Sequence, residues 1–550
     1  MSDQQAKWRL ANDLQIAEPR VISGEFHNHS CVSPDVSESY MCLPNILNVV
    51  FREDLAKLPE EARFKANDEE AFDFFMSADH FRSSPRNPDG QLCMSTVYRA
   101  IAEQISIYNK LKAQGKYKAK VYYPGFEWDM PGLDHATVAL ITDGVHVPLE
   151  GIRAFEWLYS SLTYTDLFTE GEEEEFGPRL NEQGQDKEKT FEALAWIKKY
   201  YPNSFFSLNH PSAKKGTSRE IKIEEIRRLH DLAPEIFFSF EGLPGNQFSG
   251  DRGEYSEVYG GADIMAAELG GVWDALLGEG RRIFILGNSD FHFKISSNGQ
   301  YSSGYWPSEY SKNYFLAQSD NFLDIVQSLR QGNAFCVLGN LITALDFSVT
   351  VARAKNTAEE AGTKTSACMG GELQVERGST VEIIVRFKEG EINNYQEIPY
   401  KADAETEQSN AAEAEEKAKI YELKHPELHH LDLIVGSMTG KADDYTASSN
   451  PSTRVLKRFY RDDFSEPDSE GFREIRFRTL LEESSYFRLR GTNLAPSTVG
   501  YTDEEGNPLK DIELIKSNYA NRWYFFHLIN MRNYRSLWFY SNPIFIKASP

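Results

Sequence analysis

Short apolar runs alternate with longer, charged segments over the first 345 residues, and this alternation constrains the fold more than any other feature. Segments such as 191–200 and 223–232 have the apolar spacing of helices. Strands that alternate with helices predict a parallel α/β sheet or barrel, whose functional groups follow the carboxyl ends of the strands. The apolar runs that we interpret as strands are residues 21–26, 74–78, 120–126, 136–142, 204–208, 236–240 and 282–286.

The pattern changes after Asn340, where β-rich runs are separated by turn residues. It predicts an antiparallel β-sandwich over residues 346–550, after an α/β domain at 1–345. An acidic run at 169–175 and a low-complexity stretch at 402–419, rich in Ala, Glu and Lys, are expected to be solvated insertions. The expected strands of the second domain are residues 379–387, 431–436, 473–478, 485–490, 523–528 and 536–540.

Composition limits the partners and the setting of the chain. A formal net charge of −24 argues against binding to long nucleic acids, because phosphate-backbone binding depends on Lys and Arg. No run approaches the roughly 18 apolar residues of a membrane span, and the first residues lack the apolar stretch of a secretory signal. Five cysteines show no paired framework and no CxxC spacing. A reducing cytoplasm is the expected location.

Histidines and carboxylates stand at the edges of nearly all these expected strands. The first run is followed by His27 and His29, which share one face because strand side chains alternate. A lone His at a strand end is more often structural than a metal ligand. The joint pattern is different, since a buried cluster of imidazoles and carboxylates is costly without a cation. Such ligands suit Zn²⁺, Mn²⁺ or Fe²⁺. The later edges carry Asp35, Asp79-His80, Glu127, Asp134-His135, His210-Pro211 and Asp290-Phe291-His292.

This order of motifs resembles the polymerase and histidinol phosphatase (PHP) superfamily over residues 20–345. The resemblance implies a distorted (β/α)7 barrel with three divalent metal ions, followed here by the sandwich. It implies that His27, His29, Glu127 and Asp290 hold one ion. Glu127 would bridge to a second ion held by His135 and His210, and Asp35, His80 and His292 would hold the third. His146, at the far end of the same strand as His135, remains an alternative to it.

The resemblance also implies a metal-dependent phosphoesterase. A metal-activated water would hydrolyse a phosphomonoester or phosphodiester of a small molecule. Glu127, His210, Asp290 and Arg82 are the expected catalytic residues, with Arg82 as a phosphate contact or else a salt-bridge partner. Lys214 and Lys215 are weaker phosphate candidates.

Two other functions remain open. One is a metal-dependent hydrolase of a carboxylic ester, amide or lactone, and the other is a binding protein without catalysis on the same scaffold. A homo-oligomer is also compatible with the sequence. Trp128 and residues 301–306 are candidates for stacking a substrate ring, and Asp79 for orienting a ligand His. His425, His429 and His430 are expected to be structural or surface residues.

Overall fold

The structure is a computed structural model in which most of the chain is described. Four sequence features fall outside the described residues, namely the stretch 402–419, the expected strand 523–528, residues 301–306 and His425. The described residues are 8–14, 18–36, 39–58, 71–160, 165–168, 171–181, 184–244, 257–292, 307–352, 365–391, 426–511 and 533–549.

A large mixed sheet forms the centre of the first part, and it contains all seven strands expected there. Their order across the sheet is β11-β8-β7-β6-β5-β2-β1. Each contributes buried side chains because both faces of the sheet are covered. The bounds are β1 Arg20–Glu25, β2 Phe74–His80, β5 Val121–Asp129, β6 His135–Ala139, β7 Phe205–Leu208, β8 Phe237–Pro244 and β11 Phe284–Asn288.

The expectation of a parallel sheet is wrong for β6. This strand runs antiparallel to both β5 and β7, whereas β1, β2 and β5 are mutually parallel, as are β7, β8 and β11. The link from β5 to β6 spans only residues 130–134, and a parallel crossover needs a dozen residues or more. A short connection therefore forces the chain to reverse direction.

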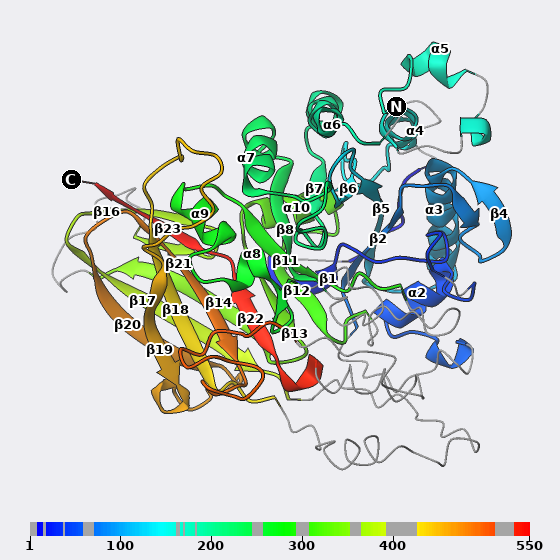
Figure 1. Cartoon of the computed structure of the whole chain (residues 1–550). Helices are drawn as coiled ribbons and strands as arrows, with labels where there is room; N and C mark the ends of the chain where they lie inside the picture. Colours follow the sequence, from blue (N-terminus) through cyan, green and yellow to red (C-terminus); the bar gives the residue numbers. More distant parts are fainter. Residues whose placement is uncertain are drawn as a thin grey trace, which may run out of the picture.

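Helices pack around this sheet (Figure 1), and the expected helices at 191–200 and 223–232 are present as α6 and α7. In the acidic run, Glu172 is buried against Arg153 while its neighbours are exposed, so only part of that run is solvated. The helices are α2 Leu43–Val50, α3 Val97–Ala113, α4 Leu149–Tyr159, α5 Glu172–Phe176, α6 Lys187–Tyr200, α7 Ile223–Leu232, α8 Ile264–Ala267, α9 Val272–Gly278 and α10 Phe322–Arg330.

The two outer strands of this seven-strand run, β1 and β11, meet just beyond their carboxyl ends. The main-chain N–H of Asp290 donates to the carbonyl of His27, and that of His29 donates to Phe291, both at 3.1 Å. One residue before His27, the main-chain N–H of Phe26 donates to the side-chain oxygen of Asn288, at the end of β11, at 2.9 Å. These bonds bring the segment after the first strand against the segment after the last one.

The large sheet continues into the C-terminal part of the chain. Beyond β1 the order is β12-β13-β22-β21-β18-β19, and every neighbouring pair is antiparallel. Figure 1 shows β22 beside β13, although about 200 residues separate them in sequence. The bounds are β12 Ser311–Ala317, β13 Ala334–Leu338, β18 His430–Ser437, β19 Arg454–Tyr460, β21 Ser485–Thr492 and β22 Trp538–Ser541.

A second, antiparallel sheet in the order β15-β14-β17-β20 packs near this extension. Phe459 of β19 and Phe477 of β20 have ring centroids 5.8 Å apart. The expected boundary at 345/346 falls within β14, and one pairing, β16 with β23, is parallel rather than antiparallel. The bounds are β14 Ile342–Val351, β15 Ser366–Cys368, β16 Glu372–Glu376, β17 Ser379–Glu389, β20 Arg473–Leu481 and β23 Ile544–Ser549; the small hairpins are β3 Ser84–Arg86 with β4 Leu92–Ser95 and β9 Val258–Tyr259 with β10 Ala262–Asp263.

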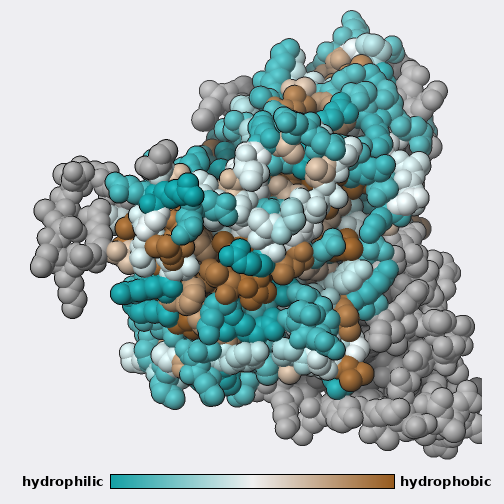
Figure 2. All heavy atoms as spheres, turned by 60° about the vertical axis from the view of Figure 1, so that its left-hand side comes forward, coloured by the Kyte–Doolittle hydropathy of each residue, from teal (hydrophilic) through white to brown (hydrophobic). Residues whose placement is uncertain are grey.

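A single apolar core runs through both parts of the molecule. A buried ion pair links them as well: Arg488 of β21 donates to Asp274 of α9 at 2.7 and 2.8 Å. The face drawn in Figure 2 is hydrophilic over most of its area, with apolar groups near its middle. Within the described ranges, every helix is too short or too polar to cross a bilayer.

Candidate metal centre

His27 and His29 leave the end of β1 on the same side and enter the interior of the protein. Between them, Asn28 points elsewhere and donates to Glu25 and Ser289. Both imidazoles are fully buried, and their Nε2 atoms lie 3.0 Å apart. The alternation of side chains along an extended segment therefore produces the expected pair.

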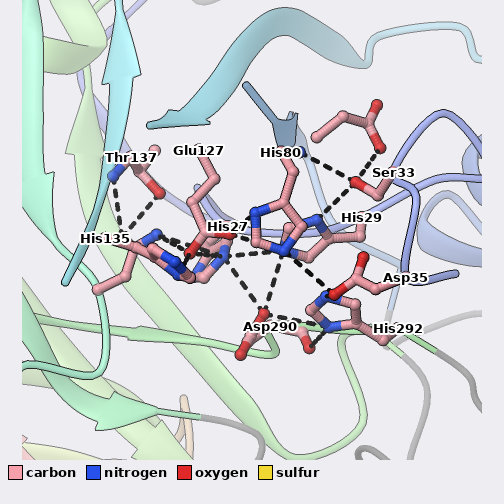
Figure 3. Close-up of polar contacts among 12 residues, drawn as sticks. His27, His29, Ser33, Asp35, His80, Glu127, His135, Thr137, Asp290 and His292 are labelled. Atoms are coloured by element: carbon pink, nitrogen blue, oxygen red, sulfur yellow. Dashed lines mark hydrogen bonds and ion pairs between the residues drawn. The ribbon is translucent and has the colours of Figure 1, made fainter. Parts of the chain in front are cut away.

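Glu127, in β5, lies at the middle of the cluster with Asp290 opposite (Figure 3). Its two carboxylate oxygens are 3.2 Å from Nε2 of His27 and 3.4 Å from Nε2 of His29. One oxygen of Asp290 lies 3.3 and 3.2 Å from the same two nitrogens. The structure thus brings together the four side chains expected to hold the first ion.

His135 and His210 approach Glu127 from the other side. Nδ1 of His135 lies 3.2 Å and Nε2 of His210 lies 3.4 Å from the same Glu127 oxygen. His135 is the first residue of β6, and because β6 is antiparallel, it lies at the edge where β5 and β7 end. His146 follows the opposite end of β6, away from this edge, and pairs there with Asp143. Geometry therefore favours His135 over His146 for this group.

Asp35, His80 and His292 form the third expected group. Asp35 Oδ2 lies 3.0 Å from Nε2 of His292 and 3.1 Å from Nε2 of His80. The ligand atoms of these three residues and of His29 all lie within 4.8 Å of one another. His29 therefore faces two of the groups, which the sequence did not indicate.

The donor set fits divalent cations. Two members have backbones in the left-handed region, His210 at φ 29° and Asp290 at φ 46°, and such strain persists where the surroundings fix a functional geometry. Imidazole and carboxylate together are the ligands that transition metals prefer. Several buried ligand atoms lie within ion-pair distance of one another but are not joined by hydrogen bonds of good geometry within the described residues: Glu127 Oε2, Asp290 Oδ1, His80 Nδ1, His292 Nε2 and both ring nitrogens of His135.

The pKa values also show that the imidazoles and carboxylates of the cluster interact strongly with one another. Burial opposes ionisation of Glu127, but the surrounding imidazoles, His135 foremost, hold its pKa well below the usual value. Burial lowers the pKa of His80, yet Asp35 and Glu127 outweigh it and raise this pKa to about 10. Burial lowers the pKa of His292 to about 3. The carboxylates are thus held in the anionic form that binds cations.

A buried carboxylate absent from the expected set, Glu241 of β8, orients His27. Nδ1 of His27 donates to one of its oxygens at 2.7 Å, and the main-chain N–H of His210 donates to the other at 2.8 Å. The side-chain amide of Asn288 donates at 2.9 Å to the same Glu241 oxygen that His27 contacts. Glu241 directly follows the expected strand 236–240, so the strand-end pattern could have revealed it.

Asp79 acts on His29 through Ser33 rather than directly. Nδ1 of His29 donates to the Ser33 hydroxyl at 2.8 Å, and that hydroxyl donates to Asp79 at 3.0 Å. Gln104 donates to the other Asp79 oxygen at 2.9 Å. Because both His27 and His29 donate through Nδ1, each presents the lone pair of Nε2 to the cluster.

Arg82 lies at the rim of the cluster, where it forms a bidentate pair with Asp129. Asp129 in turn lies 2.9 Å from Nε2 of His135 and belongs, with His80 and His135, to a further group able to hold a metal. Arg219 stands 3.9 Å from the same carboxylate. Asp129 and Arg219 are absent from the expected site, although Glu127 and Asp129 share a strand face two residues apart.

Three other candidate residues or groups have contacts that indicate structural roles. Lys215 pairs with Glu257. Trp128 is buried in the core and donates to the carbonyl of Tyr159, so its ring is not available for stacking. His430 lies buried in β18 beside His429, as expected for structural residues.

Comparisons with known proteins identify no family. No family model matches the chain, and no curated protein matches it. A two-domain protein from Bacteroides vulgatus containing a predicted PHP-like metal-dependent phosphoesterase is 11% identical, with 90% of this chain and 96% of that chain covered and a TM-score of 0.31. PsfC from Pseudomonas syringae is 15% identical over 54% of this chain and 82% of its own, with a TM-score of 0.26. Both TM-scores are too low to carry an argument.

Proposed function

We propose that the protein is a metal-dependent hydrolase of small phosphate esters, with a centre for up to three divalent ions. The observation that carries the proposal is the meeting of the nine expected ligands, Glu127 among them, in one buried cluster. On this proposal the seven strands β11 to β1 form a distorted barrel, and the ligands lie at its carboxyl edge. The ligands are His27, His29, Asp35, His80, Glu127, His135, His210, Asp290 and His292.

Two arginines favour an anionic substrate. The guanidinium groups of Arg82 and Arg219 both lie at Asp129, at the edge of the cluster. Both side chains are partly exposed, so each can contact a phosphate oxygen without leaving its carboxylate partner. A carboxylic ester or amide carries no charge that would need them.

The residues divide the work between binding and positioning. Divalent cations held by the nine ligands would lower the pKa of a water molecule and neutralise charge on the phosphoryl oxygens. Glu241 and the Ser33–Asp79 pair fix the ring orientation of His27 and His29. Arg82 and Arg219 would hold the non-reacting oxygens of the ester.

A substrate panel tests this function. Purified protein with added Mn²⁺, Zn²⁺ or Fe²⁺ is assayed on p-nitrophenyl phosphate, bis-p-nitrophenyl phosphate, nucleotides and p-nitrophenyl acetate. We expect metal-dependent release from at least one phosphate ester, abolished in His27→Ala and Asp290→Ala. Arg82→Ala should raise KM or lower kcat, and Arg82→Lys should restore part of the loss. Activity confined to carboxylic esters, or less than one bound metal per chain, would contradict the proposal.

A further inference from the structure

A cavity of about 480 Å³ lies between the segments that follow β7 and β8. Its volume is within the usual range for small-molecule sites. Its lining combines an apolar patch with polar and charged side chains. The charged ones are Lys215, Glu220, Lys222, Glu224 and Glu268. The apolar lining is Ile221, Ile223, Ile264, Met265 and Val272.

Two chain segments connect this cavity with the metal centre. Pro211 and Ser212 line the cavity, and they directly follow His210, a member of the Glu127 group. Arg219 reaches Asp129 at the rim of the centre, and the next residues, Glu220 to Glu224, line the cavity. Two segments that line the cavity are therefore continuous in sequence with residues of the metal centre and its rim.

The cavity is already shaped in this structure. The hydroxyl of Ser212 donates to Asp263 at 2.8 Å, and its main-chain N–H donates to the same carboxylate at 3.1 Å. The Asp263 side chain also caps α8, whose Ile264 and Met265 form part of the lining. Hydrogen bonds thus hold the loop after β7 against the start of α8, which follows β10.

The C-terminal part of the chain supplies one wall. Thr446 and Ser448, both exposed, line the cavity from the loop between β18 and β19. Arg227 of α7 fixes this loop, because its guanidinium donates to the carbonyls of Tyr445 and Ala447. The Arg227 side chain is 1% exposed and pairs with Glu279, so the wall is anchored to the interior.

We propose that this cavity receives the organic group of the phosphate ester, with an apolar body, while the phosphate lies at the metal centre. The inference rests on the proposed function and adds the substrate class: phosphate esters of an aliphatic or aromatic alcohol rather than of a compact, fully polar one. The loop at 446–448 is then a determinant of specificity supplied from outside the α/β part.

The test uses the metal-loaded full-length protein and n-alkyl phosphates from methyl to octyl. Burial of methylene groups in the apolar lining should raise kcat/KM roughly two- to fourfold per added carbon until the cavity is filled. Ser448→Trp should lower the octyl-to-methyl ratio of kcat/KM at least tenfold by filling the cavity. Its neighbour Ser449, exposed on the same loop but outside the lining, provides the matched control Ser449→Trp, which should keep the wild-type ratio.

Val272→Phe narrows the cavity from α9 and should lower the same ratio. Octyl phosphonate, which is not hydrolysed, should inhibit wild-type turnover of methyl phosphate more strongly than methyl phosphonate does. Turnover without dependence on chain length, or equal ratios in Ser448→Trp and Ser449→Trp, would overturn the assignment of the cavity alone. Absence of turnover of every phosphate ester with every metal would instead overturn the proposed function.

Discussion

Glu241 accepts a hydrogen bond from Nδ1 of His27 at 2.7 Å, and both side chains are fully buried. The other Glu241 oxygen accepts from the main chain of His210. One carboxylate therefore positions residues of two ligand groups, on segments that are far apart in sequence.

Glu241→Gln should weaken metal binding by about 10- to 100-fold, because a neutral amide no longer supports the basicity and orientation of His27. Competition with a fluorescent chelator measures the affinity. Glu382→Gln, in a surface ion pair of β17, is the matched control and should bind metal as the wild type does. An unchanged affinity in Glu241→Gln would refute the positioning role.

Metal affinity should rise with pH. Asp35 and Glu127 raise the pKa of His80 to about 10 in the metal-free protein despite its burial, so a proton occupies this imidazole at neutral pH. A ligand imidazole must lose its proton to bind a metal, and each displaced proton makes the apparent affinity increase about tenfold per pH unit. Chelator competition between pH 6 and 8 should show this slope. A flat profile would contradict proton displacement.

Acid should destabilise the fold partly through His430. Burial, with help from Arg458, lowers its pKa to about 4, against an ordinary value of 6.5. The unfolded chain therefore takes up the proton more readily, so the contribution to stability is complete above pH 6.5 and is lost as the pH falls towards 4. Urea unfolding at pH 7.5 and 5 should show a smaller loss of free energy in His430→Gln than in wild type. An equal loss would contradict the assignment.

Arg488→Met should destabilise the protein by about 3–5 kcal/mol, because it leaves the buried carboxylate of Asp274 without its ion-pair partner. The double variant Arg488→Met/Asp274→Leu should recover part of this loss. Arg478→Met, which breaks an exposed pair with Glu382, should cost less than about 1 kcal/mol. Urea unfolding measures all three. A loss in Arg488→Met as small as that in Arg478→Met would show that the buried pair is not important.

The sequence predicted the strands of the first part better than their directions. Apolar runs reveal buried strands, but hydrogen-bond direction depends on the connection. For β6, the short link after Asp129 determines an antiparallel direction, and the apolar periodicity does not record the length of that link. The continuity of the sheet from β13 to β22 was not predictable, because no local pattern records a pairing between segments so distant.

The side chains expected to be ligands lie together because strand alternation and strand ends determine where such side chains point. The supporting residues were harder to predict. Asp129 and Arg219 lie together in the fold but are 90 residues apart in sequence. Ser33 links Asp79 to His29 through contacts that form only in the folded chain. A lone serine or arginine carries no periodic signal.

The pairing of β13 with β22 has a consequence for synthesis on the ribosome. At about 5–20 residues per second, β22 emerges roughly 10–40 seconds after β13. During that interval β13 is an open strand edge, able to pair with the wrong chain. The synthesis of β22 therefore closes an edge that the nascent α/β part exposes until then.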